Sequence, residues 1–179
     1  MRRATLLLFA VLGILLLGCS ELRTVTVPAQ QSTINVVTDT VRLLETCKQY
    51  DPDRVIHLGA YVAHKSWENP TEAIEVNGIG TNNVFDAARL SDVATCLYAS
   101  TASVYGTVDD YYWKDDPVVV HETDPVKPEN PYAVTKYTNE VMGRTYDEKY
   151  SPSYVGVRIG GTSSREGRSA GPVSIEAVS

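Results

Sequence analysis

Tyr132 and Lys136 are the two residues of this sequence whose types and spacing could do chemistry. They stand four positions apart, so on a helix their side chains lie on one face. A phenol has an ordinary pKa of about 10 and is a poor base at neutral pH unless its anion is stabilised. A nearby ammonium group and the N-terminal end of a helix both stabilise that anion. Such a pair could remove a hydroxyl proton while hydride leaves the same carbon.

A second pair with the same spacing, Tyr61 and Lys65, shows that spacing alone does not identify a site. The sequence contains eleven tyrosines, so a chance pair is expected. Tyr61 follows the end of a predicted strand and lies in a loop without a capping residue. Tyr132 instead follows Asn130 and Pro131, which are typical of a helix N-cap and a first helical position. This context favours the Tyr132 pair as functional and the Tyr61 pair as incidental.

Helical and strand patterns alternate along the chain around this pair. The predicted elements, in order, are helix 38–50, strand 54–60, helix 70–90, strand 93–99, helix 131–149 and strand 154–159. Alternation of this kind implies right-handed crossovers between parallel strands. We therefore expect an α/β fold with a doubly wound parallel sheet and helices on both faces.

The ends of the three predicted strands carry small or hydroxylated residues. These ends are 57–60, 100–103 and 160–161. Open parallel sheets bind ligands at the carboxyl ends of their strands. Small residues let a flat cofactor approach the backbone, and hydroxyl groups can orient a substrate. Any one of these ends could be a plain turn, but the three together indicate a binding edge.

Four segments resemble the motifs of one known family and occur in the same order. They are VIHLGA at 55–60, NGIGTNNV at 77–84, YASTASVYG at 98–106 and NPYAVTK at 130–136. They are similar to the extended short-chain dehydrogenase/reductases, specifically the UDP-glucose 4-epimerase and dTDP-glucose dehydratase group. The resemblance covers roughly residues 35–162. It implies a Rossmann-like fold, NAD or alternatively NADP as cofactor, and a nucleotide sugar as substrate.

The resemblance also implies roles for individual residues. Tyr132 would be the catalytic acid/base, Lys136 would hold the nicotinamide ribose and lower the tyrosine pKa, and Thr101 would hydrogen-bond the reacting sugar hydroxyl. Asn77 would brace the sheet beside the cofactor. The residues expected to contact the cofactor are Leu58, Gly59, Ala60, Asn77, Ser100 and Lys136. In such enzymes bound NAD takes hydride from the sugar and later returns it, which gives epimerisation or prepares dehydration.

Two parts of the family pattern are not found in this sequence. The family's glycine-rich turn holds the cofactor pyrophosphate at a helix N-terminus, but no glycine stands between Gly18 and Gly59. The C-terminal substrate domain is also expected to be lacking, since the sequence runs only to Ser179. We therefore expect a partial Rossmann-like domain at 35–179, truncated at both ends, with weak affinity for NAD.

The first 19 residues differ in composition from the rest of the chain. Two arginines precede an apolar run at 6–17, which ends at Gly18 and Cys19. This pattern is typical of a secretory signal and resembles a bacterial lipobox, in which Cys19 would carry a lipid anchor. The alternative is a buried first strand with a chance cysteine. We expect a signal segment at 1–19, then a linker or poor edge strand at 20–34.

Composition and charge narrow the function classes. The sequence is 43% hydrophobic and 21% charged, as globular proteins are. A net charge of −6 without a basic stripe argues against a nucleic-acid partner. The three cysteines have no metal-ligand spacing, so no metal site is predicted. Cys47 and Cys96 fall within predicted elements, where buried free thiols are expected.

Two function hypotheses remain open at this stage. The first is an NAD-dependent nucleotide-sugar epimerase or dehydratase, for which a cytoplasmic location is expected. The second is a non-catalytic lipoprotein, anchored to a membrane, that keeps a degenerate domain as a binding or structural module. The family resemblance also implies a homodimer formed through the helices at 70–90 and 131–149.

Overall fold

The computed structural model describes residues 4–8, 24–25, 37–106, 120–160 and 175–178. Within these residues a six-stranded sheet has the order β2-β1-β3-β4-β5-β6. The parallel strands are β1 (Ala4–Leu8), β2 (Thr24–Val25), β3 (Pro52–His57), β4 (Thr95–Thr101) and β5 (Ser153–Ile159). β6 (Ile175–Val178) pairs with β5 in the antiparallel direction. The predicted α/β class with a parallel sheet is confirmed.

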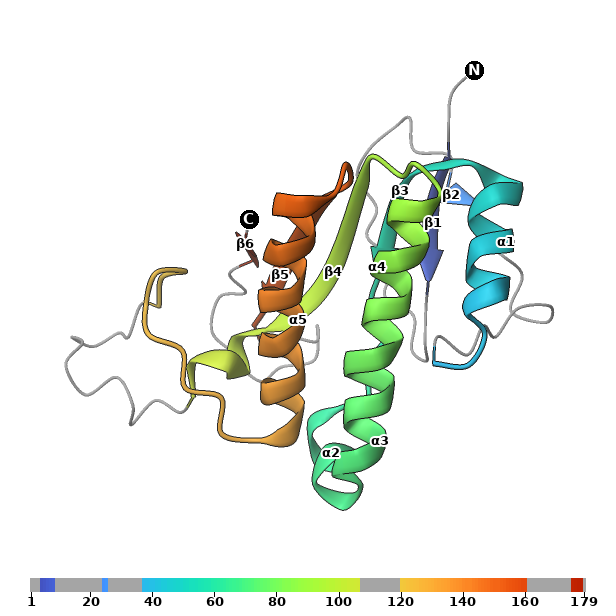
Figure 1. Cartoon of the computed structure of the whole chain (residues 1–179). Coiled ribbons are helices and arrows are strands. Elements are labelled where there is room, and N and C mark those ends of the chain that lie inside the picture. The colour runs from blue at the N-terminus through green and yellow to red at the C-terminus, as the bar shows by residue number, and fades with distance from the viewer. Residues whose placement is uncertain (1–3, 9–23, 26–36, 107–119, 161–174, 179) are drawn as a thin grey trace, which may run out of the picture.

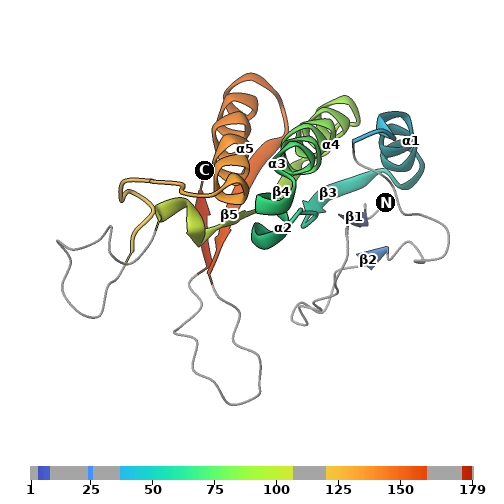
Figure 2. The same cartoon turned by 90° about the horizontal axis from the view of Figure 1, so that it is seen from below.

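The long helices form a second layer over this sheet. α1 (Thr40–Tyr50), α4 (Gly80–Leu90) and α5 (Pro131–Lys149) lie side by side on one face, as Figures 1 and 2 show. Helices on both faces were expected, but the described helices cover one face. The connections β2–β3, β3–β4 and β4–β5 all step in the same direction across the sheet. Right-handed crossovers that step in one direction place their helices on the same face.

The predicted helix at 70–90 is continuous, but it contains a π-helical segment between two α-helical segments. α3 (Pro70–Ala73), the π-helical segment η1 (Ile74–Ile79) and α4 follow one another without a break. The short helix α2 (Ala63–Glu68) precedes them. A π-helical turn is rare and often marks a functional site, and hydrophobic periodicity does not reveal it. Here the turn contains Asn77, one of the residues singled out from the sequence.

The N-terminal residues contribute two strands to the sheet. β1 pairs in parallel with β3 on one side and with β2 on the other. A strand at Ala4–Leu8 agrees with the alternative interpretation of this segment, and β2 is the edge strand left open for 20–34. Cys19 and the rest of the expected signal lie outside the described residues, so the lipid anchor stays a prediction. No helix in the described part of the chain is both long enough and apolar enough to cross a membrane.

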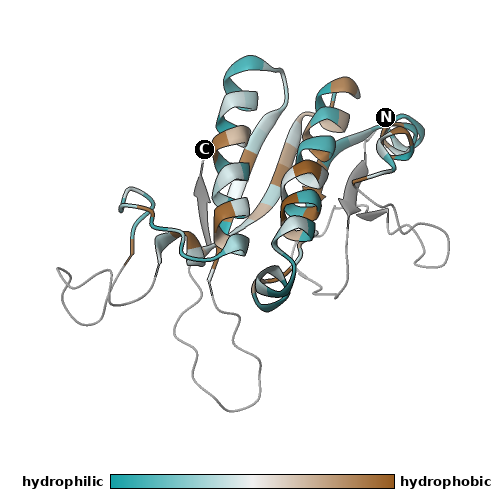
Figure 3. Cartoon of the chain, turned by 60° about the horizontal axis from the view of Figure 1, so that its bottom comes forward, coloured by the Kyte–Doolittle hydropathy of each residue, from teal (hydrophilic) through white to brown (hydrophobic). Residues whose placement is uncertain are grey.

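Aromatic rings fill the core between α4, α5 and the sheet. Phe85 lies 4.9 Å from Tyr98 and 5.1 Å from Tyr154, measured between ring centroids, and both pairs meet edge to face. This geometry suits the charge distribution of aromatic rings. The Tyr154 hydroxyl donates a 3.0 Å hydrogen bond to the Phe85 carbonyl. Figure 3 shows hydrophobic residues recurring along α4, and Cys47 and Cys96 are buried free thiols, as predicted.

Two glycines make room for the ring of Tyr98. Gly143 lies on α5 and Gly156 on β5, on either side of the ring. A Cβ atom on Gly143 would overlap the Tyr98 hydroxyl, and one on Gly156 would lie 2.8 Å from the same oxygen. Real Cβ atoms do not approach so closely. The two glycines therefore allow α5 to sit close to β4 and β5.

We expect Gly143→Ala to lower the free energy of unfolding by about 1–3 kcal/mol, because the added methyl group overpacks the core. Gly78→Ala is the matched control, since a Cβ atom there would meet nothing within 4 Å. Urea denaturation should show the control within about 1 kcal/mol of wild type, since alanine favours a helix over glycine. Adding Tyr98→Phe to Gly143→Ala should recover part of the loss. Equal stability of Gly143→Ala and wild type would contradict this account of the packing.

Candidate active site

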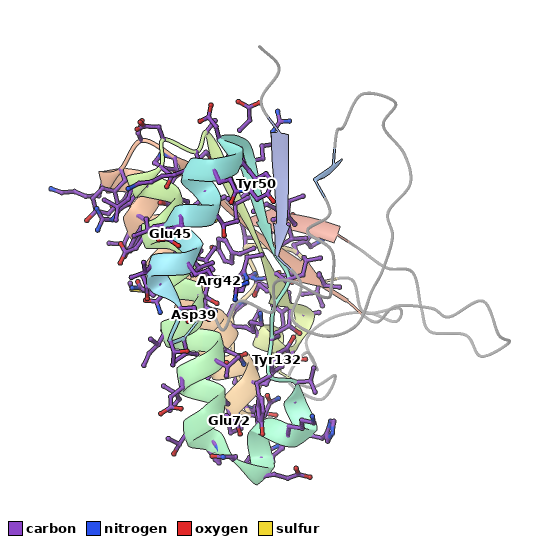
Figure 4. All side chains as sticks on the ribbon, turned by 90° about the vertical axis from the view of Figure 1, so that its right-hand side faces the viewer. Asp39, Arg42, Glu45, Tyr50, Glu72 and Tyr132 are labelled. Carbon is purple, nitrogen blue, oxygen red and sulfur yellow. The ribbon has the colours of Figure 1, made fainter. Side chains whose placement is uncertain are left out.

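The start of α5 places the predicted Tyr/Lys pair. The Asn130 side chain accepts a 2.8 Å hydrogen bond from the Ala133 N–H, and Pro131 is the first helical residue. This local capping confirms the predicted helix start. It puts Tyr132 in the first turn and Lys136 one turn later. Figure 4 shows Tyr132 toward the end of the molecule where the parallel strands finish, away from Tyr50.

Lys136 is buried, and its side chain links α5 to β4. Its exposed fraction is 1%, and its Nζ donates a 2.8 Å hydrogen bond to the Ala99 carbonyl. The same nitrogen lies 5.9 Å from the centre of the Tyr132 ring. Burial lowers the Lys136 pKa to about 8. At neutral pH the ammonium is therefore still mostly charged, close to the aromatic ring.

Tyr132 and Thr101 meet at the end of β4. Burial raises the pKa of Tyr132, and the hydrogen bond with the Thr101 side chain lowers it by a smaller amount. The lowered tyrosine pKa that the resemblance implied is therefore not found. The reason is that half-burial of the phenol outweighs the stabilisation of its anion, while the Lys136 ammonium is held at the Ala99 carbonyl.

Asn77 braces the loop that follows β3. Its side-chain nitrogen donates 3.0 Å hydrogen bonds to the Tyr61 carbonyl and to the Thr135 hydroxyl. Its side-chain oxygen accepts a 2.6 Å bond from the Tyr61 N–H. Asn139 on α5 donates a 2.8 Å bond to the Asn77 carbonyl. These contacts match the bracing expected of Asn77, whereas its contact with a cofactor stays a prediction.

The loop that Asn77 holds contains the expected cofactor-contact residues Leu58, Gly59 and Ala60. Gly59 is buried, and Leu58 and Ala60 are partly exposed, directly after the end of β3. They lie at the same edge of the sheet as Thr101, because β3 and β4 are parallel neighbours. Gly160 follows β5 at this edge, and Gly161 lies outside the described residues.

The Ser100 side chain contacts a buried carboxylate, and its expected contact with a cofactor stays a prediction. Its hydroxyl donates a 2.5 Å hydrogen bond to the carboxylate of Glu140, so it is engaged inside the protein. Glu140 also accepts bonds of 2.9 and 2.6 Å from Arg158. The sequence analysis missed this buried ion pair. One signal was available: Glu140 continues the four-residue spacing of Tyr132 and Lys136 along α5.

His57 is a second buried polar group that the sequence analysis did not single out. Its Nε2 lies 3.1 Å from the Thr81 hydroxyl, and its Nδ1 has no hydrogen-bond partner among the residues that the structure describes. Burial and, second, the charge of Lys136 lower the His57 pKa to about 3, so the ring is neutral at physiological pH. Within the described residues no cluster of three or more His, Cys, Asp or Glu side chains could hold a metal ion.

Comparison with known proteins identifies the family of the chain. The model of the GDP-mannose 4,6 dehydratase family matches residues 28–172. An uncharacterized protein of Methanocaldococcus jannaschii is 36% identical over 118 residues, which cover 65% of this chain and 34% of that protein. A GDP-mannose 4,6-dehydratase of Yersinia enterocolitica is 34% identical over 119 residues, covering 64% of this chain and 30% of the relative.

A solved structure agrees with the fold. The UDP-glucose 4-epimerase of Brucella ovis, in complex with NAD, superposes with a TM-score of 0.60 and 31% identity, over 70% of this chain and 36% of that chain. The chain thus spans about a third of the length of the curated relatives it matches, 34% and 30% for the two above. Since the family model matches most of the sequence, the chain belongs to the GDP-mannose 4,6 dehydratase family, among the NAD-dependent epimerases and dehydratases of the short-chain dehydrogenase type.

Proposed function

We propose that this chain carries the site for NAD-dependent oxidation and reduction of a nucleotide sugar, as in epimerases and dehydratases. The observation that carries the proposal is the contact between the Thr101 and Tyr132 side chains beside the buried Lys136. Hydroxyl, phenol and ammonium meet at the carboxyl edge of a parallel sheet, where such folds bind ligands. The solved relative bound to NAD supports the cofactor class.

The described residues fit the nicotinamide half of the cofactor. The Lys136 ammonium has three N–H donors. One of them bonds the Ala99 carbonyl, and the ammonium can also donate to hydroxyl groups of the ribose. Leu58, Gly59 and Ala60 offer a small-residue loop at the same edge. NAD, when bound, supplies a hydride acceptor and a positively charged ring. NADP would meet the same residues at this end.

The protein's own groups then handle the proton. Tyr132 takes the proton of the reacting sugar hydroxyl as hydride leaves that carbon, and it gives the proton back in the reverse step. Thr101 hydrogen-bonds the same hydroxyl and orients it toward the phenol. Lys136 supplies positive charge 5.9 Å from the centre of the Tyr132 ring. Because the Tyr132 pKa is raised in the free chain, the phenol is protonated until further positive charge arrives.

Tyr132→Phe should lower turnover by roughly 10²–10⁴-fold, the usual contribution of a positioned acid or base. NAD affinity should stay within about twofold of wild type, since the ring remains and only its hydroxyl is lost. The measurement pairs calorimetric titration of the full chain with NAD and turnover assays on GDP-mannose and UDP-glucose. Tyr61→Phe, from the second Tyr-x-x-x-Lys pair, is the control and should leave turnover unchanged.

Two results would count against this function. If the full chain showed no binding at millimolar NAD or NADP, the oxidoreductase proposal would fail, and the hypothesis of a non-catalytic binding module would take its place. If NAD bound and Tyr132→Phe turned over as fast as wild type, the role given to Tyr132 would be refuted.

Lys136 should make the folded chain more stable as pH rises from about 8 to 10.5. Its pKa is lowered to about 8 from 10.5, so in this window the unfolded chain binds the extra proton. Below about pH 8 both states are protonated and the contribution is constant.

Urea denaturation at a series of pH values measures this rise in stability. The rise should be absent in Lys136→Met and present in Lys48→Met, whose side chain is exposed. Burial raises the Cys96 pKa to about 12, so this thiol makes the folded chain less stable as pH rises. Because Cys96 is present in both lysine variants, the difference between their profiles reports the contribution of Lys136 alone. A Lys136→Met profile parallel to wild type would contradict the lowered pKa.

We further propose that the chain forms a homodimer through α5 and the helix at 70–90. Ile74 and Ile79 on η1 and Val134 and Val141 on α5 are exposed apolar side chains, and these two elements pack against each other. Exposed apolar patches of this kind mark protein interfaces.

Sedimentation of the wild type at micromolar concentration should therefore give a dimer, and Val134→Lys with Val141→Lys should give a monomer. A lysine at Val41, an exposed apolar residue on α1, is the control and should leave the dimer intact. A wild-type monomer, or a charged double variant that still dimerises, would exclude this interface.

A further inference from the structure

Glu140 and Arg158 are charged side chains that the reaction itself does not use, yet both are buried. Their exposed fractions are 0% and 4%. The Arg158 guanidinium donates two hydrogen bonds to the Glu140 carboxylate, one of 2.9 Å from Nε and one of 2.6 Å from Nη2. Removing two charges from water is costly, and apolar residues often stabilise a core equally well. A pair kept in this position therefore calls for an explanation beyond stability.

The remaining guanidinium nitrogen of Arg158, Nη1, makes hydrogen bonds outside the ion pair. It donates a 2.6 Å hydrogen bond to the Tyr105 hydroxyl and a 3.3 Å bond to the Glu122 carbonyl. The guanidinium also lies 4.6 Å from the centre of the Tyr105 ring, within the range of a cation–π contact. One side chain on β5 thus holds two segments that come from elsewhere in the chain.

One of these segments adjoins Thr101, and the other is tied to that segment. Tyr105 ends the short helix η2 (Ala102–Tyr105), which begins directly after Thr101 and is capped by it. The Ser103 N–H donates a 3.2 Å bond to the Thr101 hydroxyl. The Lys127 N–H donates a 2.8 Å bond to the Val104 carbonyl, which ties η2 to the segment that contains Glu122.

The other end of the network reaches the strand that carries Thr101. The Ser100 hydroxyl donates to Glu140, and Ser100 pairs in register with Arg158 on the neighbouring strand. Glu140 lies on α5 one turn beyond Lys136. The network therefore joins the four parts that meet at the site: α5, β4, β5 and η2.

We propose that Glu140, Arg158 and Tyr105 are positioning residues, which hold η2 against α5 so that the Thr101 hydroxyl stays in contact with the Tyr132 phenol. The inference deepens the proposed function, because Thr101 and Tyr132 are the groups assigned to the sugar hydroxyl. Burial alone would lower the Arg158 pKa, but the hydrogen bonds to Glu140 and Tyr105 outweigh it and raise the pKa above its ordinary value, so the guanidinium stays charged.

A matched pair of variants separates positioning from plain stability. Tyr105→Phe deletes the hydroxyl that accepts from Arg158, and Tyr154→Phe deletes a hydroxyl that donates to the Phe85 carbonyl in the aromatic core. Both tyrosines are buried, so each variant loses a buried hydrogen bond of its hydroxyl group. Only Tyr105 belongs to the network around Thr101.

Hydrogen exchange of backbone amides in the full chain gives the local readout. In Tyr105→Phe, the amides of Ser103, Gly106 and Lys127 should exchange roughly tenfold faster than in wild type, as expected for local opening after loss of a charge-assisted bond. In Tyr154→Phe they should change less than about twofold. Arg158→Lys keeps a charge opposite Glu140 but loses the planar fork, and it should behave like Tyr105→Phe.

Turnover gives the second readout. In Tyr105→Phe, kcat for the sugar nucleotide should fall roughly tenfold while NAD affinity stays within about twofold; Tyr154→Phe should keep wild-type kcat. Equal exchange rates in Tyr105→Phe and Tyr154→Phe, or wild-type exchange in Arg158→Lys, would overturn the inference. Because exchange is measured without cofactor, a chain that binds no NAD would end the proposed function while the exchange data still decide the positioning role.

Discussion

The hydrogen bond from the Lys136 ammonium to the Ala99 carbonyl joins α5 to the end of β4 over 2.8 Å. Because this ammonium is buried, any sliding or rotation of the helix would leave a charge without a partner inside the protein, which is strongly unfavourable. Helical spacing then determines the neighbours of Lys136. Tyr132 lies one turn before it, near the carboxyl ends of the parallel strands, and Glu140 lies one turn after it, over the paired Ser100 and Arg158.

Close packing along the same helix face completes this constraint. Gly143, the next residue toward the sheet after Glu140, leaves space for the Tyr98 ring, and Gly156 does the same from β5. A side chain at either position would push α5 away from the sheet and lengthen the contact between Lys136 and Ala99. The position of Tyr132 and Lys136 near the start of α5 and the packing of Gly143 near its end therefore depend on the same distance between this helix and the sheet.

Local signals made parts of this arrangement predictable. The cap at Asn130 and Pro131 predicted α5 correctly, and short apolar runs located β3, β4 and β5. The contacts that tie these elements together were not predictable. The Glu140–Arg158 pair joins residues 18 positions apart and depends on how α5 packs against β5, which no spacing along the chain encodes. The two-residue strand β2 is too short for any period to appear.

Burial shifts the two groups of the Tyr/Lys pair in opposite directions. It raises the pKa of Tyr132 and lowers that of Lys136 to about 8, and in each case it favours the neutral form. The site therefore holds a protonated phenol beside an ammonium that is still mostly charged at neutral pH. A tyrosinate becomes accessible only when another positive charge enters the site or when the phenol gains further hydrogen bonds. The Thr101 hydroxyl already contributes one such bond, and this is why its position relative to the phenol matters for the chemistry that the site can support.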